Sequence, residues 1–147
     1  RSSDLLIPPE YVQNTEERLR LYTELDAIET EEKLQTFARK LEDRFGKLPR
    51  QINELFDGLR IRWIAKKIGF ERIILKNGKL RCYFLDNPKS PYYDSPYFPK
   101  VMAHIQNAKK KCVMKQSGNS LILVYDNIKT MRETQAIFRE VDEKVFG

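Results

Sequence analysis

Apolar residues recur every three or four positions along the first half of the chain, which is the spacing of helices with one buried face. The pattern predicts a first helix over residues 15–28 and a second that begins after its N-cap Thr30 and ends at Gly46. A third helix is expected to begin at Pro49, whose missing N–H needs no partner in a first helical turn, and to end at Gly69. The residues expected to be buried are Leu21, Leu25 and Ile28, then Leu34, Phe37, Ala38, Leu41 and Phe45, and then Ile52, Leu55, Phe56, Leu59, Trp63 and Ile64.

In the second half the apolar spacing changes to every second residue, which is typical of strands with one buried face. Asn77-Gly78 lies between two such runs and is a strong signal for a two-residue hairpin turn. The expected cross-strand pairs are Leu75 with Leu80 and Ile73 with Cys82. A second hairpin is predicted over residues 111–125, with its turn at 117–119.

Two further helices are predicted in this half, one short and one long. The short helix follows a proline- and tyrosine-rich loop over residues 86–99 and begins at Ser95-Pro96. The long helix covers residues 128–145. The residues expected on their inner sides are Phe98, Val101, Met102 and Ile105, and then Met131, Phe138, Val141 and Val145.

These elements predict an α+β fold in which two β-hairpins form a small antiparallel sheet packed with helices. We expect residues 1–14 to be an extended lead-in and residues 15–147 to be one domain. Within that domain, the helical half covers residues 15–69 and the hairpin-and-helix half covers residues 70–147. Because the chain opens without Met, we interpret it as a fragment of a longer protein.

The composition changes this picture only slightly. The formal net charge of +6 favours acidic partners, although the bases are spread along the chain and fit an ordinary solvated surface. Cys82 and Cys112 lie in apolar runs without a CxxC pair, so we expect free thiols and no zinc site. No apolar run approaches the length of a membrane span, and no membrane partner is expected.

The sequence contains no assembled catalytic motif, so we expect no enzyme activity and no cofactor in this chain. There is neither a GxxxxGK[ST] phosphate-binding loop nor a GxGxxG motif. A serine–histidine–acid triad would require His104, which we interpret as a packed or surface residue of the short helix. The neighbouring acids Glu16-Glu17 and Glu31-Glu32 occupy first helical turns, where the helix dipole accounts for them.

Two features leave alternatives open. The bases Arg60, Arg62, Lys66 and Lys67 on the third helix form either a solvated surface, which we favour, or a contact face for nucleic acid phosphates. The segment Pro91–Tyr97 either anchors a protein interface through its tyrosines or covers one end of the sheet.

One series of motifs in the first half is more specific. It comprises Ile7-Pro8-Pro9-Glu10-Tyr11-Val12, Arg18-Leu19-Arg20-Leu21-Tyr22, Asp43-Arg44-Phe45-Gly46-Lys47-Leu48-Pro49, and Leu59-Arg60-Ile61-Arg62-Trp63-Ile64-Ala65-Lys66-Lys67-Ile68-Gly69. In this order the motifs resemble the C-terminal domain of the bacterial transcription-repair coupling factor family. The second half of the chain agrees with that family in layout only.

The resemblance implies a regulatory role within a longer cytoplasmic protein of bacteria. The parent protein would be an ATP-driven DNA translocase that acts on stalled RNA polymerase and recruits nucleotide-excision repair. Its ATP-binding motor would precede residues 1–14. The domain would dock on a module of the parent chain that resembles UvrB and mask the surface meant for UvrA.

For the docking contact, we expect Asp43, with Glu42 beside it, to pair with basic residues of that module at the exposed end of the second helix, and Arg44 to belong to the same contact. The alternative is a local ion pair from Asp43 to Arg39 or Lys47, worth a few tenths of a kcal/mol, roughly. The second hypothesis for the function, a basic accessory domain that contacts nucleic acid, depends on the basic residues of the third helix. A third hypothesis, a small enzyme that acts alone, lacks an assembled site motif.

Overall fold

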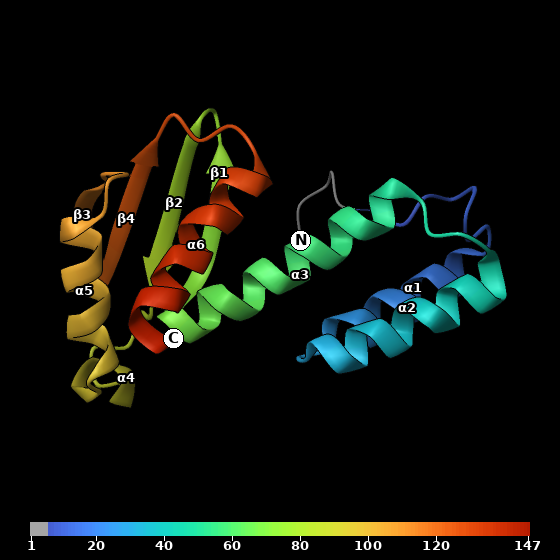
Figure 1. Ribbon diagram of the computed structural model, residues 1–147, viewed down its shortest axis with the longest axis horizontal. Coiled ribbons are helices and arrows are strands. Elements are labelled where there is room, and N and C mark those ends of the chain that lie inside the picture. Colours follow the sequence, from blue (N-terminus) through green and yellow to red (C-terminus); the bar gives the residue numbers. More distant parts are fainter. Residues whose placement is uncertain (1–5) are drawn as a thin grey trace. The chain divides into compact units, whose positions relative to one another are not determined.

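A computed structural model describes residues 6–147, whose elements confirm the predicted α+β class (Figure 1). Contacts along the chain define two compact units, Arg1–Arg60 and Ile61–Gly147. The division lies inside a helix, whereas the sequence division between residues 69 and 70 follows the change from helix to strand. Along residues 6–147, no helix combines the length and the apolar character that a bilayer crossing requires.

The first unit contains helices α1 (Thr15–Asp26) and α2 (Glu31–Phe45) and the beginning of α3 (Arg50–Ile68). The Asn14 side chain accepts a hydrogen bond from Glu17 N (2.9 Å) at the start of α1. The Thr30 hydroxyl accepts one from Lys33 N (3.2 Å), which confirms the predicted N-cap of α2. Ion pairs join Glu24 to Lys40 and Glu17 to Arg44, so α1 and α2 lie side by side and antiparallel.

The core of the first unit matches most of the apolar pattern of α1 and α2. Its buried residues from these helices are Leu21, Leu25, Leu34, Phe37, Ala38 and Leu41. Phe45 was predicted to be buried but is only half-buried, because α2 ends there against Tyr11. Gly46 has the expected positive φ of 93°, but its ψ of −171° is extended and not that of a left-handed helix.

Helix α3 changes its buried face along its length. Ile52, Leu55, Phe56 and Leu59 are buried within one stripe of the helix, whereas Ile61, Ala65 and Ile68 are buried on the opposite stripe. The first set belongs to the first unit and the second set to the core of the second unit. The prediction of one inner side that continues through Trp63 and Ile64 was therefore wrong, and both of these residues are only half-buried.

The second unit is built on an antiparallel sheet in the order β1-β2-β4-β3. Its strands are β1 (Phe70–Lys76), β2 (Lys79–Phe84), β3 (Val113–Ser117) and β4 (Ser120–Asp126). The register pairs Leu75 with Leu80 and Ile73 with Cys82, which confirms the first predicted hairpin. Asn77 and Gly78 have φ values of 54° and 74°, the positive values that this turn requires.

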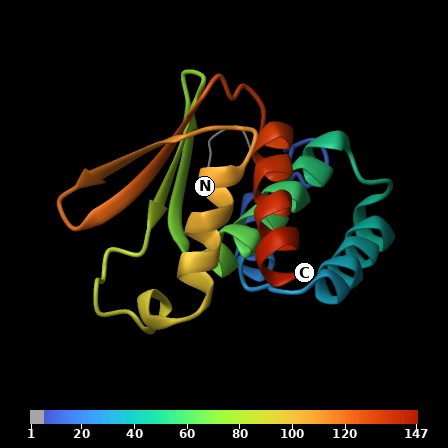
Figure 2. The ribbon, with the colours of Figure 1, turned by 60° about the vertical axis from the view of Figure 1, so that its left-hand side comes forward.

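Helices cover one face of this sheet. Figure 2 shows α5 (Tyr97–Asn107) and α6 (Met131–Phe146) on the same side of the strands. Val101 and Phe138 from these helices pack with Leu80, Phe84 and other strand residues that point to that side. Helix α6 begins after its N-cap Thr130, so Met131 lies in the first turn and is exposed, contrary to the prediction that it faces inward.

The proline- and tyrosine-rich loop contains a one-turn helix, α4 (Pro91–Asp94), that the sequence analysis missed. The Ser90 hydroxyl accepts a hydrogen bond from Tyr92 N and caps this turn. The Tyr92 and Tyr93 hydroxyls donate to Ile68 O and Leu85 O, and both rings pack against the core. These two tyrosines therefore cover an end of the sheet. Tyr97 is more exposed and stacks on Phe146.

Gly69 provides a test of this packing. A Cβ added at Gly69 would lie 2.6 Å from Tyr92 Cε2, and φ is +115°. We expect Gly69→Ala to lower the free energy of unfolding by roughly 2–4 kcal/mol, because strain in the backbone and overlap with the ring add together. Gly78→Ala is the matched control, since φ is +74° there with open space around it. It should cost only about 1–2 kcal/mol in urea unfolding followed by circular dichroism, and equal losses for the two variants would contradict the proposed overlap.

Candidate functional site

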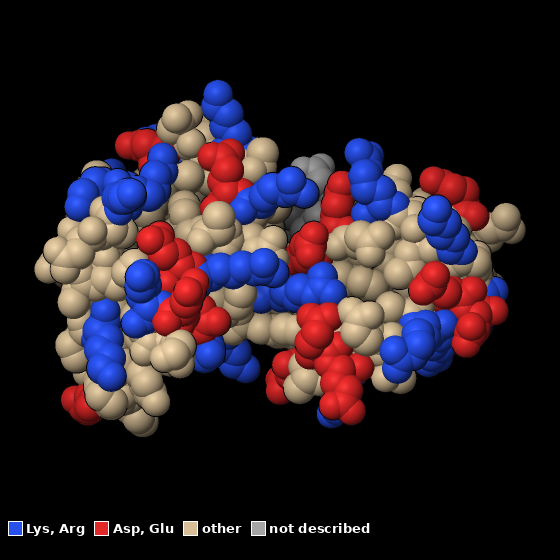
Figure 3. Space-filling view, in the orientation of Figure 1, with Lys and Arg blue, Asp and Glu red and all other residues tan. Residues whose placement is uncertain are grey.

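Basic and acidic side chains are interspersed on the face of the molecule that Figure 3 draws. A mixed surface suits polar contact with another protein, because it can match a charge pattern of either sign locally. What each charged residue can bind therefore depends on the partners that it already has.

Arg60 and Lys67 on α3 have acidic partners. Arg60 Nε lies 2.7 Å from Glu31 Oε1, and Arg60 Nη1 lies 2.9 Å from Asp57 Oδ1. Hydrogen bonding to Glu31 is the main reason that the pKa of Arg60 is raised. Lys67 Nζ lies 2.8 Å from Asp142 Oδ1 and 4.8 Å from the centre of the Phe146 ring.

The other two bases, Arg62 and Lys66, are exposed. Because carboxylates neutralise Arg60 and Lys67 locally, the positive potential along α3 is weaker than the sequence suggests. Arg60 also belongs to the first unit and the other three bases to the second. The four residues therefore do not form one uniform basic face.

Two carboxylates at the end of α2 have no ion-pair partner among the described residues. Glu42, Asp43 and Arg44 are all exposed in the last turn of the helix. Within residues 6–147, the carboxylates of Glu42 and Asp43 form no hydrogen bond or ion pair, and the alternative local pair of Asp43 with Arg39 or Lys47 is absent. These two carboxylates are exposed and can pair with an incoming cation.

Arg44 has a different role from its two neighbours. Its guanidinium forms an ion pair with Glu17 of α1 and lies 4.8 Å from the centre of the Phe45 ring. Glu17 also accepts a hydrogen bond from Arg20 Nη2 (2.5 Å). Hydrogen bonds from Arg20 and then Arg44 lower the pKa of Glu17 from its ordinary value of 4.5. Arg44 therefore holds α1 and α2 together beside the acidic pair.

The lead-in is a folded part of the first unit. Tyr11 N and Val12 N donate to Pro8 O (3.0 and 3.1 Å), so the chain turns after Pro8, where an extended segment was expected. Ile7 and Val12 are only 3% and 1% exposed. The predicted extended conformation of residues 1–14 is therefore wrong for the turn, and residues 1–5 lie outside the described part.

Tyr11 joins this lead-in to the end of α2. Its hydroxyl donates to Gly46 O (2.7 Å) and lies 3.3 Å from Leu41 O, two carbonyls near a helix end that lacks internal donors. The Tyr11 ring lies 5.7 Å from the Phe45 ring. Burial, followed by the nearby Glu42 charge, raises the pKa of Tyr11, which keeps its hydroxyl a donor. This contact holds the backbone directly beside the acidic pair.

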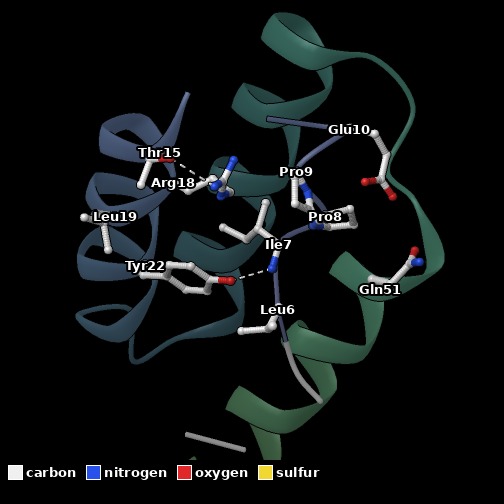
Figure 4. Close-up of a pocket in the computed structure, with 10 residues that line it drawn as sticks. All are labelled: Leu6, Ile7, Pro8, Pro9, Glu10, Thr15, Arg18, Leu19, Tyr22 and Gln51. Atoms are coloured by element: carbon white, nitrogen blue, oxygen red, sulfur yellow. Dashed lines mark hydrogen bonds between the residues drawn. The ribbon is translucent and has the colours of Figure 1, made fainter. Parts of the chain in front are cut away.

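A shallow apolar groove lies between residues 6–10 of the lead-in and α1 (Figure 4). Its volume is about 450 Å³. The Tyr22 hydroxyl closes its floor by accepting a hydrogen bond from Ile7 N (2.5 Å). Leu6 and Leu19 line the groove and are 52% and 61% exposed. The first unit thus presents an apolar surface in addition to its acidic helix end.

In the part of the chain that the structure describes, no three His, Cys, Asp or Glu side chains are placed to hold a metal ion. His104 is half-buried on α5. Cys82 and Cys112 are free thiols, and burial raises the pKa of both.

The sequence analysis missed the roles of Tyr11, Arg18 and Tyr22, although it quoted the motifs that contain them. Arg18 Nη1 donates to Val12 O (2.6 Å) and so fixes the lead-in from α1. Tyr11 reaches across 35 positions to Gly46. The spacing of apolar residues reports only contacts within an element, so it could not predict a contact at that separation. The one signal in the sequence was the position of Tyr11 shortly after two prolines.

Comparisons with known proteins agree with the resemblance expected from the motifs. Residues 2–95 match the family model of the TRCF domain. The chain is 22% identical over 137 residues to the transcription-repair-coupling factor of Borreliella burgdorferi, a match that covers 92% of this chain and 12% of the relative. It is 32% identical over 68 residues to that of Escherichia coli K12, covering 46% of this chain and 6% of the relative.

A solved structure extends the likeness to nearly the whole chain. The crystal structure of the C-terminal domain of transcription-repair coupling factor superposes with a TM-score of 0.72 at 18% identity, covering 99% of this chain and 90% of that chain. The fold is therefore shared beyond the matched motifs. The chain spans 12% or less of the length of the two relatives described above.

The role of the Tyr11 hydroxyl is testable by its removal. Tyr11→Phe leaves the ring in place but deprives Gly46 O of its donor, so we expect the free energy of unfolding to fall by about 1 kcal/mol. Tyr97→Phe is the matched control at a tyrosine that is 44% exposed and should change stability little. Urea unfolding measures both, and an unchanged midpoint for Tyr11→Phe would show that water replaces the bond without cost.

Glu17 gives the first unit a dependence on pH. Because its pKa is lowered in the folded state, its contribution is present above the ordinary value of 4.5 and is lost as pH falls through the folded value. We expect Glu17→Gln to be less stable than the parent at pH 7, and the difference to shrink at lower pH. The control is Glu29→Gln at an exposed position. A constant difference between the Glu17 variant and the parent from pH 7 to pH 3 would contradict this role.

Proposed function

The chain belongs to the TRCF domain family, and we propose that it is a regulatory domain that docks on another protein module and catalyses no reaction itself. The observation that carries the proposal is the pair of exposed carboxylates, Glu42 and Asp43, which have no ion-pair partner within residues 6–147 and lie beside a backbone held by Tyr11. Fixed charges of this kind recognise a basic surface with little loss of conformational entropy.

For the partner, we propose the module of the parent protein that resembles UvrB. Docking there would mask the surface that recruits UvrA, so the domain would inhibit repair recruitment until the parent protein engages RNA polymerase and DNA. In this proposal, ATP is used by an upstream motor and has no site in this domain.

A polar contact suits such a switch. When two modules are tethered in one chain, the effective concentration reaches roughly the millimolar range, so a weak interface remains closed. An external partner that binds only the undocked form then shifts the equilibrium towards that form, by an amount that its affinity sets. A large apolar interface would be harder to release.

The proposal is tested by binding in trans. Calorimetry at low salt, with this chain and the purified UvrB-like module of its parent protein, should show one site. Asp43→Lys should weaken binding by about tenfold or more, because the attraction between Asp43 and a basic residue of the module becomes a repulsion between two cations in the interface. Glu42→Lys should have a smaller effect in the same direction if its carboxylate lies nearer the rim.

Glu140→Lys is the matched control, a charge reversal at an exposed position of the second unit. It should leave the affinity within about twofold of the parent value. Absence of binding by the unsubstituted chain at low salt would refute the proposed docking. Equal losses for Asp43→Lys and Glu140→Lys would refute the assigned contact.

The alternative of a basic domain that contacts nucleic acid has less support, because Arg60 and Lys67 are already ion-paired. A gel shift with duplex DNA distinguishes the nucleic-acid alternative from docking on a protein module. Binding that weakens steeply with salt would favour the alternative.

A further inference from the structure

Strand β3 is an open edge of the sheet in the second unit. It comes last in the order β1-β2-β4-β3 and pairs only with β4 among the described strands. All five of its residues are exposed, including Val113 at 52% and Met114 at 42%. The strand contains neither proline nor a bulge, two devices that commonly prevent an edge from pairing.

The turn of this hairpin determines which backbone groups face outward. Ser117 pairs with Ser120 across Gly118-Asn119, and Gly118 has a φ of 61°. A two-residue turn is flanked by a pair that exchanges hydrogen bonds, and such pairs then alternate along the ladder. Residues 113, 115 and 117 therefore bond to β4, whereas the N–H and C=O groups of Met114 and Gln116 point to the open edge.

Lysines surround this edge. Lys109, Lys110, Lys111 and Lys115 lie on or next to β3, and residues 108–120 contain no acid. Their field reaches the neighbouring strand, because Lys115 and Lys110 help to lower the pKa of Asp126 after its closest partner, Lys79. An incoming strand therefore meets positive charge near the start of β3 and at Lys115 in its middle.

This charge decides between two possible occupants. A second copy of β3 that paired antiparallel over all five residues would place Lys115 directly opposite Lys115, which is unfavourable. A strand with acids at alternate positions would instead place a carboxylate opposite Lys115. The lysines thus disfavour self-association and favour acidic partners.

From these observations we propose that β3 binds an extended acidic segment of a partner protein, which adds to the sheet as a fifth strand. Met114 and Gln116 would supply the backbone hydrogen bonds, and Lys115 with the lysines before the strand would select acids. This surface lies in the second unit and outside residues 2–95, so it is independent of the acidic docking site on α2.

The experiment titrates the chain with a capped ten-residue peptide of alternating glutamate and valine. A matched peptide with lysine in place of glutamate serves as the control for charge. Amide chemical shifts and hydrogen exchange identify the site. We expect the acidic peptide to bind with protection of the Met114 and Gln116 amides, and the lysine peptide to bind at least tenfold more weakly.

Two variants separate strand addition from simple charge attraction. Met114→Pro removes an outward N–H that β4 does not use, so it should abolish peptide binding and leave the hairpin paired, whereas Met114→Ala should bind like the parent. Lys115→Glu keeps the backbone donors and should weaken binding at least tenfold. If Met114→Pro disturbs the hairpin, the protection of the Met114 and Gln116 amides in the parent chain still distinguishes strand addition from charge attraction. Lys115→Glu then still tests the selection of acids.

Three results would overturn the proposal. The first is no binding of the acidic peptide, and the second is equal binding to a correctly folded Met114→Pro variant. The third is displacement of the peptide by a single-stranded oligonucleotide that contacts the lysines without protecting Met114 and Gln116, which would make the surface a polyanion site.

Discussion

Both units of the structure depend on helix α3 remaining intact from Arg50 to Ile68. Its first half gives four buried residues to one core, and its second half gives Ile61, Ala65 and Ile68 to the other. A helix that serves two cores has no single apolar stripe, because each core takes the face that meets it. The sequence of α3 therefore contains two short apolar stripes in place of one continuous stripe, with Gly58 as a weak position near the change of face.

The candidate site shows how a polar surface is held rigid without a large core beneath it. Tyr11 bonds to a carbonyl beyond the end of α2, Arg18 bonds to the lead-in, and Arg44 pairs with Glu17 across two helices. Each contact joins segments that are separate in sequence and meet at the helix end. Glu42 and Asp43 are the neighbours left without such a contact, so their charge is available to a partner while the backbone beneath them is fixed.

Much of the fold could be predicted where local chemistry determines structure. The cap at Thr30 and the turn at Asn77-Gly78 each depend on residues within four positions, and both were predicted correctly. The predictions that were wrong concern features that local chemistry does not determine. The change of face in α3, the exposure of Met131 and the partners of Arg60 depend on which segments meet in three dimensions. For the candidate site, the expected contact at Asp43 stays a prediction, and the sequence could not report whether Arg39 or Lys47 would neutralise its charge.

The folded lead-in also has a mechanical consequence. A pulling force applied at Leu6 would act first on the bond between Ile7 N and the Tyr22 hydroxyl, and then on the buried side chains of Ile7 and Val12. The tension would thus enter α1 through its third turn and not through its exposed first residue. A segment anchored in this way transmits force into the folded unit, whereas a flexible linker would first extend.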